Sequence, residues 1–229
     1  MLLLFDIDGT LVRDRPLTHQ DALTEAAVEV FGLHVAPGAE PVRDVEPWGK
    51  TDRQILRDVL AAAGLPAPSG EDVARWEQAA CRAYERLEVD DGASRHAQTA
   101  ATLARLRDSG HALALVTGNL EPIARRKLGM RGLAGYFPEG QGGFGSDADL
   151  RPELVPLARA RAGRPGEPHP RDHTVLIGDT PRDVEAASAD GVRCLAVTGA
   201  RFTAEALLAA GAAATVAPIP DVEGALAAL

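Results

Sequence analysis

Two aspartates stand at the end of the first apolar segment of the chain. Leu2–Phe5 is an unbroken apolar run, which predicts a strand buried on both faces of a parallel sheet. Asp6 and Asp8 follow this run, and Gly9 and Thr10 end the strand. Two carboxylates beside such a strand are costly unless a cation or a reaction requires them. We therefore expect both side chains to meet in a crevice beyond the carboxyl end of the strand, where open α/β sheets bind ligands.

Two later apolar runs also end in polar residues. Ala112–Val116 is followed by Thr117, and Thr174–Ile177 is followed, after one glycine, by Asp179. The carboxyl ends of parallel strands lie along the same edge of a sheet. The sequence therefore predicts that Asp6, Thr117 and Asp179 converge at that edge.

The tripeptide Thr117-Gly118-Asn119 offers several contacts for a phosphate group. It combines a hydroxyl, a glycine that permits close approach of the backbone, and a side-chain amide. Together with the N-terminus of the helix expected after it, the tripeptide can hold phosphate oxygens. The alternative is a simple glycine turn capped by Asn119.

The segment Asp6-Ile7-Asp8-Gly9-Thr10 resembles the signature of the haloacid dehalogenase-like hydrolase superfamily, in its phosphatase branch. The resemblance implies that Asp6 is a nucleophile that forms an aspartyl-phosphate and that Asp8 is the general acid and base. It also implies a magnesium ion between enzyme and phosphate. Dehalogenases of the superfamily need no acid at the second position, so Asp8 favours a phosphate substrate. A neighbouring carboxylate would raise the pKa of Asp8, toward the protonated form that the leaving alkoxide needs.

Residues 178–183, GDTPRD, resemble the fourth motif of this family, an acidic pair. The resemblance implies that Asp179 binds magnesium directly and that Asp183 supports the ion or a bound water. The expected shell is Asp6, the backbone carbonyl of Asp8, Asp179 and waters, which suits the preference of magnesium for oxygen ligands. Alternatively, Asp183 only complements the dipole at the start of its helix.

The family's second and third motifs complete the predicted site. Thr117 has the phosphate-binding role of the second motif, with Gly118 and Asn119 beside it. The third motif normally supplies a lysine, and here Arg151, followed by a proline, stands in that place. Arg151 is always cationic and can bridge a carboxylate and a phosphate. Lys127 is the alternative cation. The preferred interpretation of Lys127, however, is that it lies on a solvated helix face or contacts the cap domain described next.

The chain from about residue 13 to about residue 91 has apolar residues at helical spacing. Helices are expected over 18–32, from Thr51 or Asp52 to Gly64, and from just after Ser69-Gly70 through Leu87, with a loop rich in proline and glycine over 36–49. An all-helical insert after the first strand resembles the cap of this superfamily, which closes over the active site and excludes water. We expect a helical cap domain over 15–91 and an α/β core domain over 1–14 and 92–229.

The remainder alternates strands with helices, which predicts an α/β fold, a doubly wound Rossmann-like parallel sheet. Expected helices span 94–109, 121–130, from 151 onward, 181–189, 204–210 and 222–228. Further short strands are expected at 143–144, 192–197 and 215–217.

A lysine stands at a predicted helix start within the cap. Lys50 precedes Thr51 in the sequence WGKTD, and a helix N-terminus with a nearby lysine can bind an anion. A similar loop faces the substrate in phosphoglycolate-phosphatase-like relatives, which implies substrate contacts for Lys50 and Thr51. The alternative is an ordinary N-cap by Thr51, with Lys50 in solvent.

Composition narrows the class of protein. The chain has 229 residues and a net charge of −9, which argues against a nucleic-acid binder but allows a local site for an anionic metabolite. Its two cysteines, Cys81 and Cys194, have no metal-type spacing and fit a reducing compartment. With neither a signal peptide nor an apolar run of membrane-spanning length, a cytoplasmic protein without membrane contact is expected, as a monomer or homodimer.

The predicted function is magnesium-dependent hydrolysis of a small phosphomonoester, of the phosphoglycolate or sugar phosphate class. A phosphomutase of the β-phosphoglucomutase type would share Asp6 and Asp8, and is the first alternative. A non-catalytic regulatory or binding protein on the same fold is the second, and it predicts loss of Asp6, Asp8 or Asp179. All three are present. A receiver-type signalling domain has no helical cap and is shorter than this chain, so it is the least favoured interpretation.

Overall fold

A six-stranded parallel sheet lies at the centre of the larger part of the molecule, with the strand order β3-β2-β1-β4-β5-β6. The structure, a computed structural model, describes residues 1–13, 17–88, 96–199, 201–217 and 219–229. The strands are β1 (Leu2–Phe5), β2 (Ala112–Thr117), β3 (Gly143–Phe144), β4 (Thr174–Gly178), β5 (Arg193–Val197) and β6 (Ala214–Val216). The chain begins in the middle of the sheet and extends it on both sides, so the predicted doubly wound fold is confirmed.

The register of the central strands brings their carboxyl ends to one level. Phe5 is paired with Leu115 of β2 and with Ile177 of β4. Thr117 and Asp179 each come two residues after these partners, and Asp6 follows Phe5 directly. The three strand ends predicted to carry the site therefore lie side by side.

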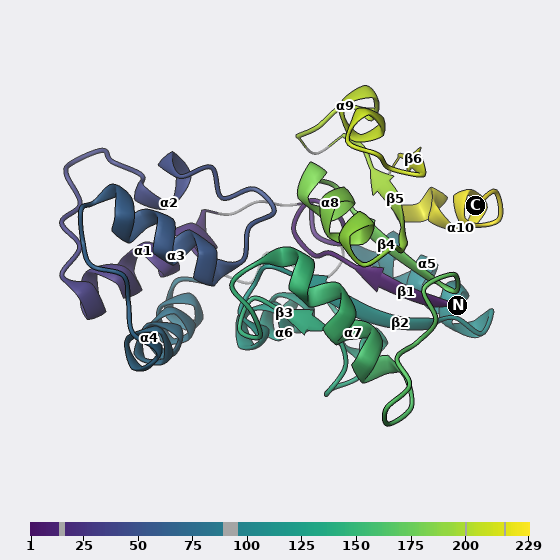
Figure 1. Cartoon of the computed structure of the whole chain (residues 1–229), viewed down its shortest axis with the longest axis horizontal. Coiled ribbons are helices and arrows are strands. Elements are labelled where there is room, and N and C mark those ends of the chain that lie inside the picture. Colours follow the sequence, from purple (N-terminus) through teal and green to yellow (C-terminus); the bar gives the residue numbers. More distant parts are fainter. Residues whose placement is uncertain (14–16, 89–95, 200, 218) are drawn as a thin grey trace.

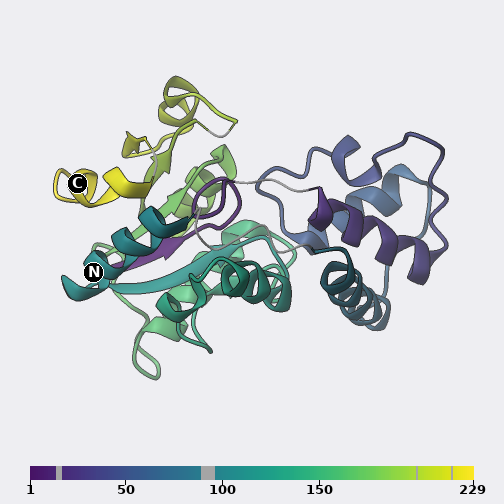
Figure 2. The same cartoon turned by 180° about the vertical axis from the view of Figure 1, so that it is seen from behind.

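Helices cover both faces of the sheet, because alternate residues of β1 point to opposite sides. Leu3 and Phe5 pack on one face and Leu2 and Leu4 on the other. The first face carries α5 (Ala97–Asp108), α6 (Glu121–Met130) and α10 (Val222–Leu226); the second carries α7 (Leu154–Ala162), α8 (Pro181–Ala189) and α9 (Ala204–Ala209). Figure 1 shows α7 and α8 in front of the sheet, and Figure 2 shows α5 and α6 from behind.

A separate group of helices stands beyond the carboxyl ends of the strands (Figure 1). This helical unit, residues 17–88, contains α1 (Thr18–Phe31), α2 (Pro41–Asp44), α3 (Asp52–Ala62) and α4 (Gly70–Leu87). It has its own hydrophobic cluster, in which Trp76 and Tyr84 are the largest buried side chains. The boundaries expected at 14/15 and 91/92 lie outside the described residues.

Three elements differ from the sequence-based expectations. The loop expected over 36–49 contains α2, which begins at Pro41, a residue favoured in a first helical turn. At Arg151 the chain forms a 3-10 turn, Arg151–Glu153, before α7 begins at Leu154. α5 begins at Ala97, whereas the expected start, Ser94, lies outside the described residues.

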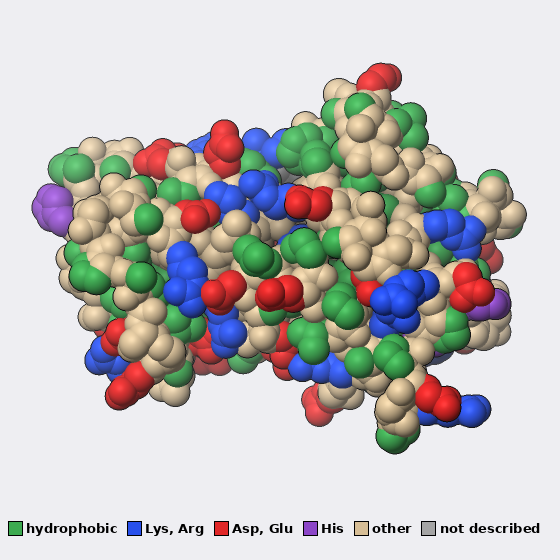
Figure 3. All heavy atoms as spheres, viewed as in Figure 1, with side chains coloured by type: hydrophobic (Ala, Val, Ile, Leu, Met, Phe, Trp, Pro, Cys, Tyr) green, Lys and Arg blue, Asp and Glu red, His purple; other side chains and the backbone are tan. Residues whose placement is uncertain are grey.

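The surface carries charges of both signs. Figure 3 shows acidic and basic side chains interspersed on the face viewed, including the region where the helical unit meets the sheet. In the described parts of the chain, the search for a helix with the length and apolarity of a membrane span found none.

Leu4→Ala is expected to lower the free energy of unfolding by about 2–5 kcal/mol, because Leu4 is fully buried in the centre of the sheet. Leu208→Ala is the matched control, since 49% of that leucine is exposed, and its effect should stay within about 0.5 kcal/mol. Urea denaturation of both variants measures the difference. Equal effects would contradict the assignment of Leu4 to the core.

Candidate active site

Asp6 lies buried at the end of β1, between the ends of β2 and β4. Its backbone N–H donates to the carbonyl of Ile177 at 2.9 Å, which continues the sheet register for one residue. Its Oδ1 accepts a hydrogen bond of 2.8 Å from Nη2 of Arg151. Burial, with the nearby charges of Asp183 and Asp8, raises the pKa of Asp6 to about 7, although the guanidinium of Arg151 opposes this shift. Burial and the neighbouring carboxylates therefore disfavour the charged form of Asp6 more than Arg151 favours it.

Arg151 joins two carboxylates at the sheet edge. Its Nη2 also donates to Oδ1 of Asp183 at 2.5 Å, and its Nη1 donates to the carbonyl of Gly49 in the helical unit at 3.3 Å. The arginine is buried, and burial by itself would lower its pKa. The two carboxylates outweigh burial and raise that pKa, so the side chain stays charged. The cation predicted for the third motif thus lies against Asp6.

Asp179 and Asp183 complete an acidic cluster at the end of β4. One carboxylate oxygen from each of Asp6, Asp179 and Asp183 lies within 4.8 Å of the others, and all three residues are buried. Asp183 also caps α8, where its Oδ2 accepts from the backbone N–H of Thr180 at 3.0 Å and from its hydroxyl at 2.7 Å. Both predicted roles of Asp183, the helix N-terminus and the acidic pair, are therefore compatible with its position.

The donor set of this cluster fits a magnesium ion. Three carboxylates supply oxygen atoms, the ligands that magnesium prefers. Of the charged groups in contact here, three are carboxylates and one is the guanidinium of Arg151, so the negative charges outnumber the positive one. A divalent cation bound by the cluster would supply what is missing.

Gly9 is required by the close approach of the loop after β1 to this cluster. Its φ is +94°, and a Cβ atom at this position would lie 2.1 Å from Oδ2 of Asp179. A side chain at residue 9 would displace the carboxylate predicted to hold the metal.

Asp8 is bound by two side chains that follow β2. Its Oδ2 accepts from Nζ of Lys127 at 2.7 Å and from Nδ2 of Asn119 at 2.8 Å. Burial alone would raise the pKa of Asp8, but the charges of Lys127 and His19 and these two hydrogen bonds lower it. The expectation of a raised pKa at Asp8 is wrong. Lys127 is distant from Asp8 in the sequence, but in the fold its ammonium group contacts the carboxylate and lowers the pKa.

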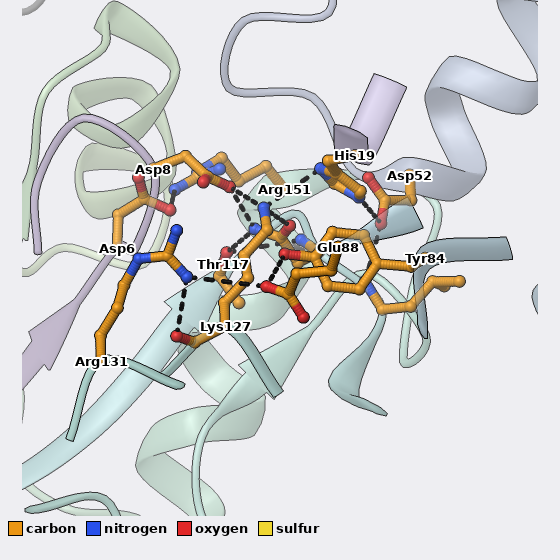
Figure 4. Close-up of polar contacts among 12 residues, drawn as sticks. Asp6, Asp8, His19, Asp52, Tyr84, Glu88, Thr117, Lys127, Arg131 and Arg151 are labelled. Atoms are coloured by element: carbon orange, nitrogen blue, oxygen red, sulfur yellow. Dashed lines mark hydrogen bonds and ion pairs between the residues drawn. The ribbon is translucent and has the colours of Figure 1, made fainter. Parts of the chain in front are cut away.

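Lys127 is a buried residue of α6, so its interpretation as a solvated helix face is wrong. It contacts the helical unit, since its Nζ lies 3.2 Å from Nδ1 of His19 in α1. It also donates to Oδ1 of Asn119 at 2.6 Å. Nζ of Lys127 thus donates to Asp8 and Asn119 and lies beside His19 (Figure 4).

Thr117 lies in the interior of the sheet part, whereas Gly118 lies against the helical unit. Thr117 is buried, and its hydroxyl oxygen accepts from Nδ2 of Asn119 at 2.7 Å. A Cβ atom on Gly118 would lie 2.0 Å from the carbonyl oxygen of Lys50. The close backbone approach expected at this glycine is made with the helical unit.

Lys50 and Thr51 lie where the helical unit meets the sheet edge. The hydroxyl oxygen of Thr51 accepts from the N–H of Gln54 at 3.1 Å, so Thr51 is the N-cap of α3. Nζ of Lys50 donates to Oδ2 of Asp58 at 2.7 Å and to the carbonyl of Val45 at 2.5 Å. Although Lys50 lines the cavity described next, its charge is paired within the helical unit.

A cavity of about 270 Å³ lies between the sheet edge and the helical unit. Asp6, Asp8 and Asp179 line it from the sheet side, and Arg151 and Lys127 lie among them. The carboxylates and their cations therefore face one cavity, which a small substrate can occupy.

Two residues that the sequence did not single out link the helical unit to this site. His19 lies with Nε2 3.0 Å from Oδ2 of Asp52 (Figure 4). The same oxygen accepts from the backbone N–H of Leu120 in the sheet part at 2.8 Å. The sequence offered one indication for Asp52, because it directly follows the N-cap residue Thr51 of a predicted helix.

The comparison with protein families agrees with this geometry. A family model described as haloacid dehalogenase-like hydrolase matches residues 3–188. The chain belongs to this family.

Phosphatases are among the relatives of this haloacid dehalogenase-like hydrolase. It is 30% identical over 226 residues to a phosphoserine phosphatase of Thermus thermophilus, covering 85% of this chain and 87% of that protein. It is 31% identical over 204 residues to phosphoglycolate phosphatase 1 of Pseudomonas aeruginosa, covering 86% and 69%. The predicted superfamily, with its phosphoglycolate phosphatase-like branch, and the predicted class, a phosphoric monoester hydrolase, are confirmed.

Solved structures of the family show the same fold. The crystal structure of a hydrolase from Pseudomonas syringae has a TM-score of 0.67 with this chain. The two are 19% identical, and the match covers 99% of this chain and 98% of that one. At this level of identity the match concerns the fold alone.

Gly9→Ala is expected to destabilise the hydrolase by more than Gly32→Ala does. Both glycines have positive φ, which costs another residue about 1–2 kcal/mol, but only at Gly9 would the new methyl group collide with Asp179. Nothing lies within 4 Å of a Cβ atom on Gly32. Thermal denaturation measures both variants, and an equal loss would show that the contact with Asp179 is not a constraint.

Proposed function

We propose that this hydrolase is a magnesium-dependent phosphatase of small phosphomonoesters that forms an aspartyl-phosphate on Asp6. One observation carries the proposal: the buried Asp6, Arg151, Asp179 and Asp183 meet at the edge of the sheet, where Asp6 and Asp8 face one cavity. The names of the two relatives, a phosphoserine and a phosphoglycolate phosphatase, support a small phosphorylated metabolite as the substrate.

Asp6 is the proposed nucleophile. Its carboxylate oxygen attacks phosphorus in line with the leaving group, so that an O–P bond forms while the ester P–O bond breaks. Arg151 holds Oδ1 of Asp6 and favours the ionised form that this attack requires. Charge spreads over the equatorial phosphate oxygens in the transition state, and a guanidinium beside them stabilises it.

Asp8 is the proposed acid and base. In the first step its protonated form gives a proton to the leaving alkoxide, and in the second the resulting carboxylate takes a proton from the water that attacks the aspartyl-phosphate, which restores the acid. Lys127 and Asn119 hold its carboxylate at the wall of the cavity. These contacts favour the charged form, which is the form that accepts the proton of the attacking water.

Magnesium would be held by the side chains of Asp6 and Asp179 and the backbone carbonyl of Asp8, with Asp183 supporting the ion. When bound, it supplies positive charge that reduces the repulsion between the carboxylates and the phosphate. The acidic cluster supports this assignment through the chemistry of its donors and their mutual distances.

Arg151 is the proposed cation of the third motif, in preference to Lys127. The arginine contacts Asp6 directly, whereas the lysine donates to Asp8 and Asn119. Thr117, Gly118 and Asn119 are proposed to border the phosphate. For Lys50 and Thr51 we retain only a place beside the substrate, because Thr51 is the N-cap of α3 and Lys50 is paired with Asp58.

The helical unit is proposed as the cap domain, with the sheet and its helices as the core. It covers the carboxyl ends of the strands, where it excludes water from the reacting groups (Figure 1). A cytoplasmic location, a monomeric or dimeric state and the absence of nucleic-acid partners stay predictions from the sequence.

The phosphomutase alternative uses the same two aspartates. A phosphomutase transfers the phosphoryl group back to the sugar, whereas a phosphatase transfers it to water. Release of inorganic phosphate from phosphoglycolate or a sugar phosphate supports the phosphatase. Conversion between sugar phosphate isomers, primed by a bisphosphate and without phosphate release, would support the mutase.

Asp6→Asn is expected to lower kcat for phosphate release at least about a thousandfold, because the amide cannot act as the nucleophile. Phosphate release from a panel of phosphorylated metabolites is the measurement. Asp172→Asn is the control, since that carboxylate is 80% exposed, and its activity should equal that of the wild type. Full activity of Asp6→Asn would disprove the proposed nucleophile.

Removal of divalent cations by a chelator is expected to abolish activity, and added magnesium should restore it. Magnesium binding should also stabilise the fold, by about 2.7 kcal/mol at a concentration one hundred times its Kd. Asp179→Asn should remove most of this stabilisation, because it removes one carboxylate of the cluster. Activity or thermal stability unaffected by the chelator would contradict the proposed metal site.

A further inference from the structure

The wall of the cavity that faces the carboxylates carries a group of apolar side chains, together with the polar His19, Gln20, Arg43, Lys50 and Asp52. Residues from all four helices of the helical unit and from the segments before α1 and α3 form this wall. The apolar side chains include Leu17, Leu23, Val42, Trp48, Ile55 and Tyr84. When the phosphate group of a substrate binds at Asp6, the alcohol portion of that substrate points away from the sheet edge. This wall is therefore the surface that the alcohol portion meets.

The two aromatic side chains of the wall, Tyr84 and Trp48, each make a contact with another residue. The hydroxyl of Tyr84 donates to Glu88 at 2.6 Å, and its ring stands edge-on to His19 with 6.0 Å between the ring centroids (Figure 4). The ring of Trp48 lies under the guanidinium of Arg201, at 3.4 Å from the ring centroid. Both residues therefore offer the cavity their rings.

The positive side chains around the cavity are already paired. In residues 17–88, Arg43 and Lys50 are the arginine and lysine that line it; Arg43 binds Glu40 at 2.9 Å, and Lys50 binds Asp58 at 2.7 Å. From the sheet part, Lys127 binds Asp8, and Arg151 binds Asp6. A second anionic group on the substrate would have to displace one of these carboxylates.

Arg131 and Arg201 also line the cavity, and each has a partner of its own. Nη1 of Arg131 donates to the backbone carbonyl of Lys127 at 3.0 Å and lies 3.7 Å from Glu88. Arg201 stacks on Trp48. Among the described residues, the arginines and lysines that contact a carboxylate of the acidic cluster at the sheet edge are thus distinct from those of the wall, which have contacts of their own.

We propose, given the proposed phosphatase function, that the preferred substrate is a phosphomonoester whose alcohol portion is apolar or aromatic and carries no second negative charge. A carboxylate against the apolar side chains of this wall would lose its hydration and would have to compete with Glu40 or Asp58 for a cation, which is unfavourable. An apolar group would instead be removed from water, which is favourable. The volume of about 270 Å³ limits that group to a small one, because it lies below the about 300–1,000 Å³ of pockets for drug-sized ligands.

The proposal separates this chain from what the names of its two relatives indicate. Phosphoserine and phosphoglycolate both carry a carboxylate beside the phosphate. The expected preference therefore runs against these two compounds, although the phosphoryl-transfer residues are those proposed above.

The first test compares benzyl phosphate with phosphoglycolate in the magnesium-loaded wild-type enzyme. Both release an alkoxide, so the comparison reports on the alcohol portion and not on an aryl leaving group. We expect kcat/KM to be at least about tenfold higher for benzyl phosphate. A ratio of one or below would overturn the proposal while supporting the phosphatase function.

Binding of benzylphosphonate and phosphonoacetate, which cannot be hydrolysed, keeps this test independent of catalysis. Calorimetry with magnesium present should show tighter binding of benzylphosphonate. If neither phosphate ester is hydrolysed, the proposed function fails. In that case the proposed preference is supported if benzylphosphonate binds more tightly than phosphonoacetate. It is overturned if benzylphosphonate binds more weakly or does not bind.

Ile55→Thr and Val59→Thr form a matched pair on α3. Ile55 is 5% exposed and lines the cavity, whereas Val59 is 3% exposed and packs inside the helical unit. Ile55→Thr is expected to lower kcat/KM for benzyl phosphate roughly tenfold and to leave that for phosphoglycolate unchanged, whereas Val59→Thr should leave the ratio unchanged.

Leu17→Ser covers the case in which Ile55→Thr does not fold. Leu17 lines the same cavity and is 49% exposed, so its replacement leaves the packed interior intact. It should lower the ratio of the two kcat/KM values in the same direction. An unchanged ratio in the folded variant would overturn the assignment of the apolar wall to the substrate.

Discussion

The contact of one arginine with two buried carboxylates is the constraint on which the site depends. Arg151 donates to Asp6 and Asp183 through the same nitrogen, and its other terminal nitrogen contacts the carbonyl of Gly49. Three carboxylates and one guanidinium leave an excess of negative charge. The sheet register, the turn at Arg151 and the position of the helical unit all serve to keep these groups together.

Much of the fold and of the acidic cluster could be predicted from the sequence. Each site aspartate follows a short apolar run, and the ends of parallel strands share one edge, so local pattern determines their placement. The contacts of Lys127 could not be predicted in the same way. They join α6 to Asp8 and to His19, which are far apart in the sequence, and they depend on how the helical unit packs against the sheet. The loop expected over 36–49 contains α2 for a similar reason, because Val42 is buried in the helical cluster.

The groups proposed for chemistry and those proposed for selectivity come from different parts of the chain. The carboxylates and their arginine follow strands of the sheet, whereas the apolar wall comes from the helical unit. The names of the relatives therefore inform the reaction more than the substrate. A shared sheet edge can process different phosphate esters when the residues above it differ.

The close approach at Gly118 has a consequence for how such proteins diversify. The carbonyl of Lys50 occupies the space that a methyl group at position 118 would fill, and the N–H of Asp52 donates to the carbonyl of Gly118 at 2.7 Å. The two loops are thus shaped to each other at the level of the backbone. Exchange of this helical unit for one from another family member would succeed only if the incoming loop followed the same path across the glycine, which restricts recombination between these genes.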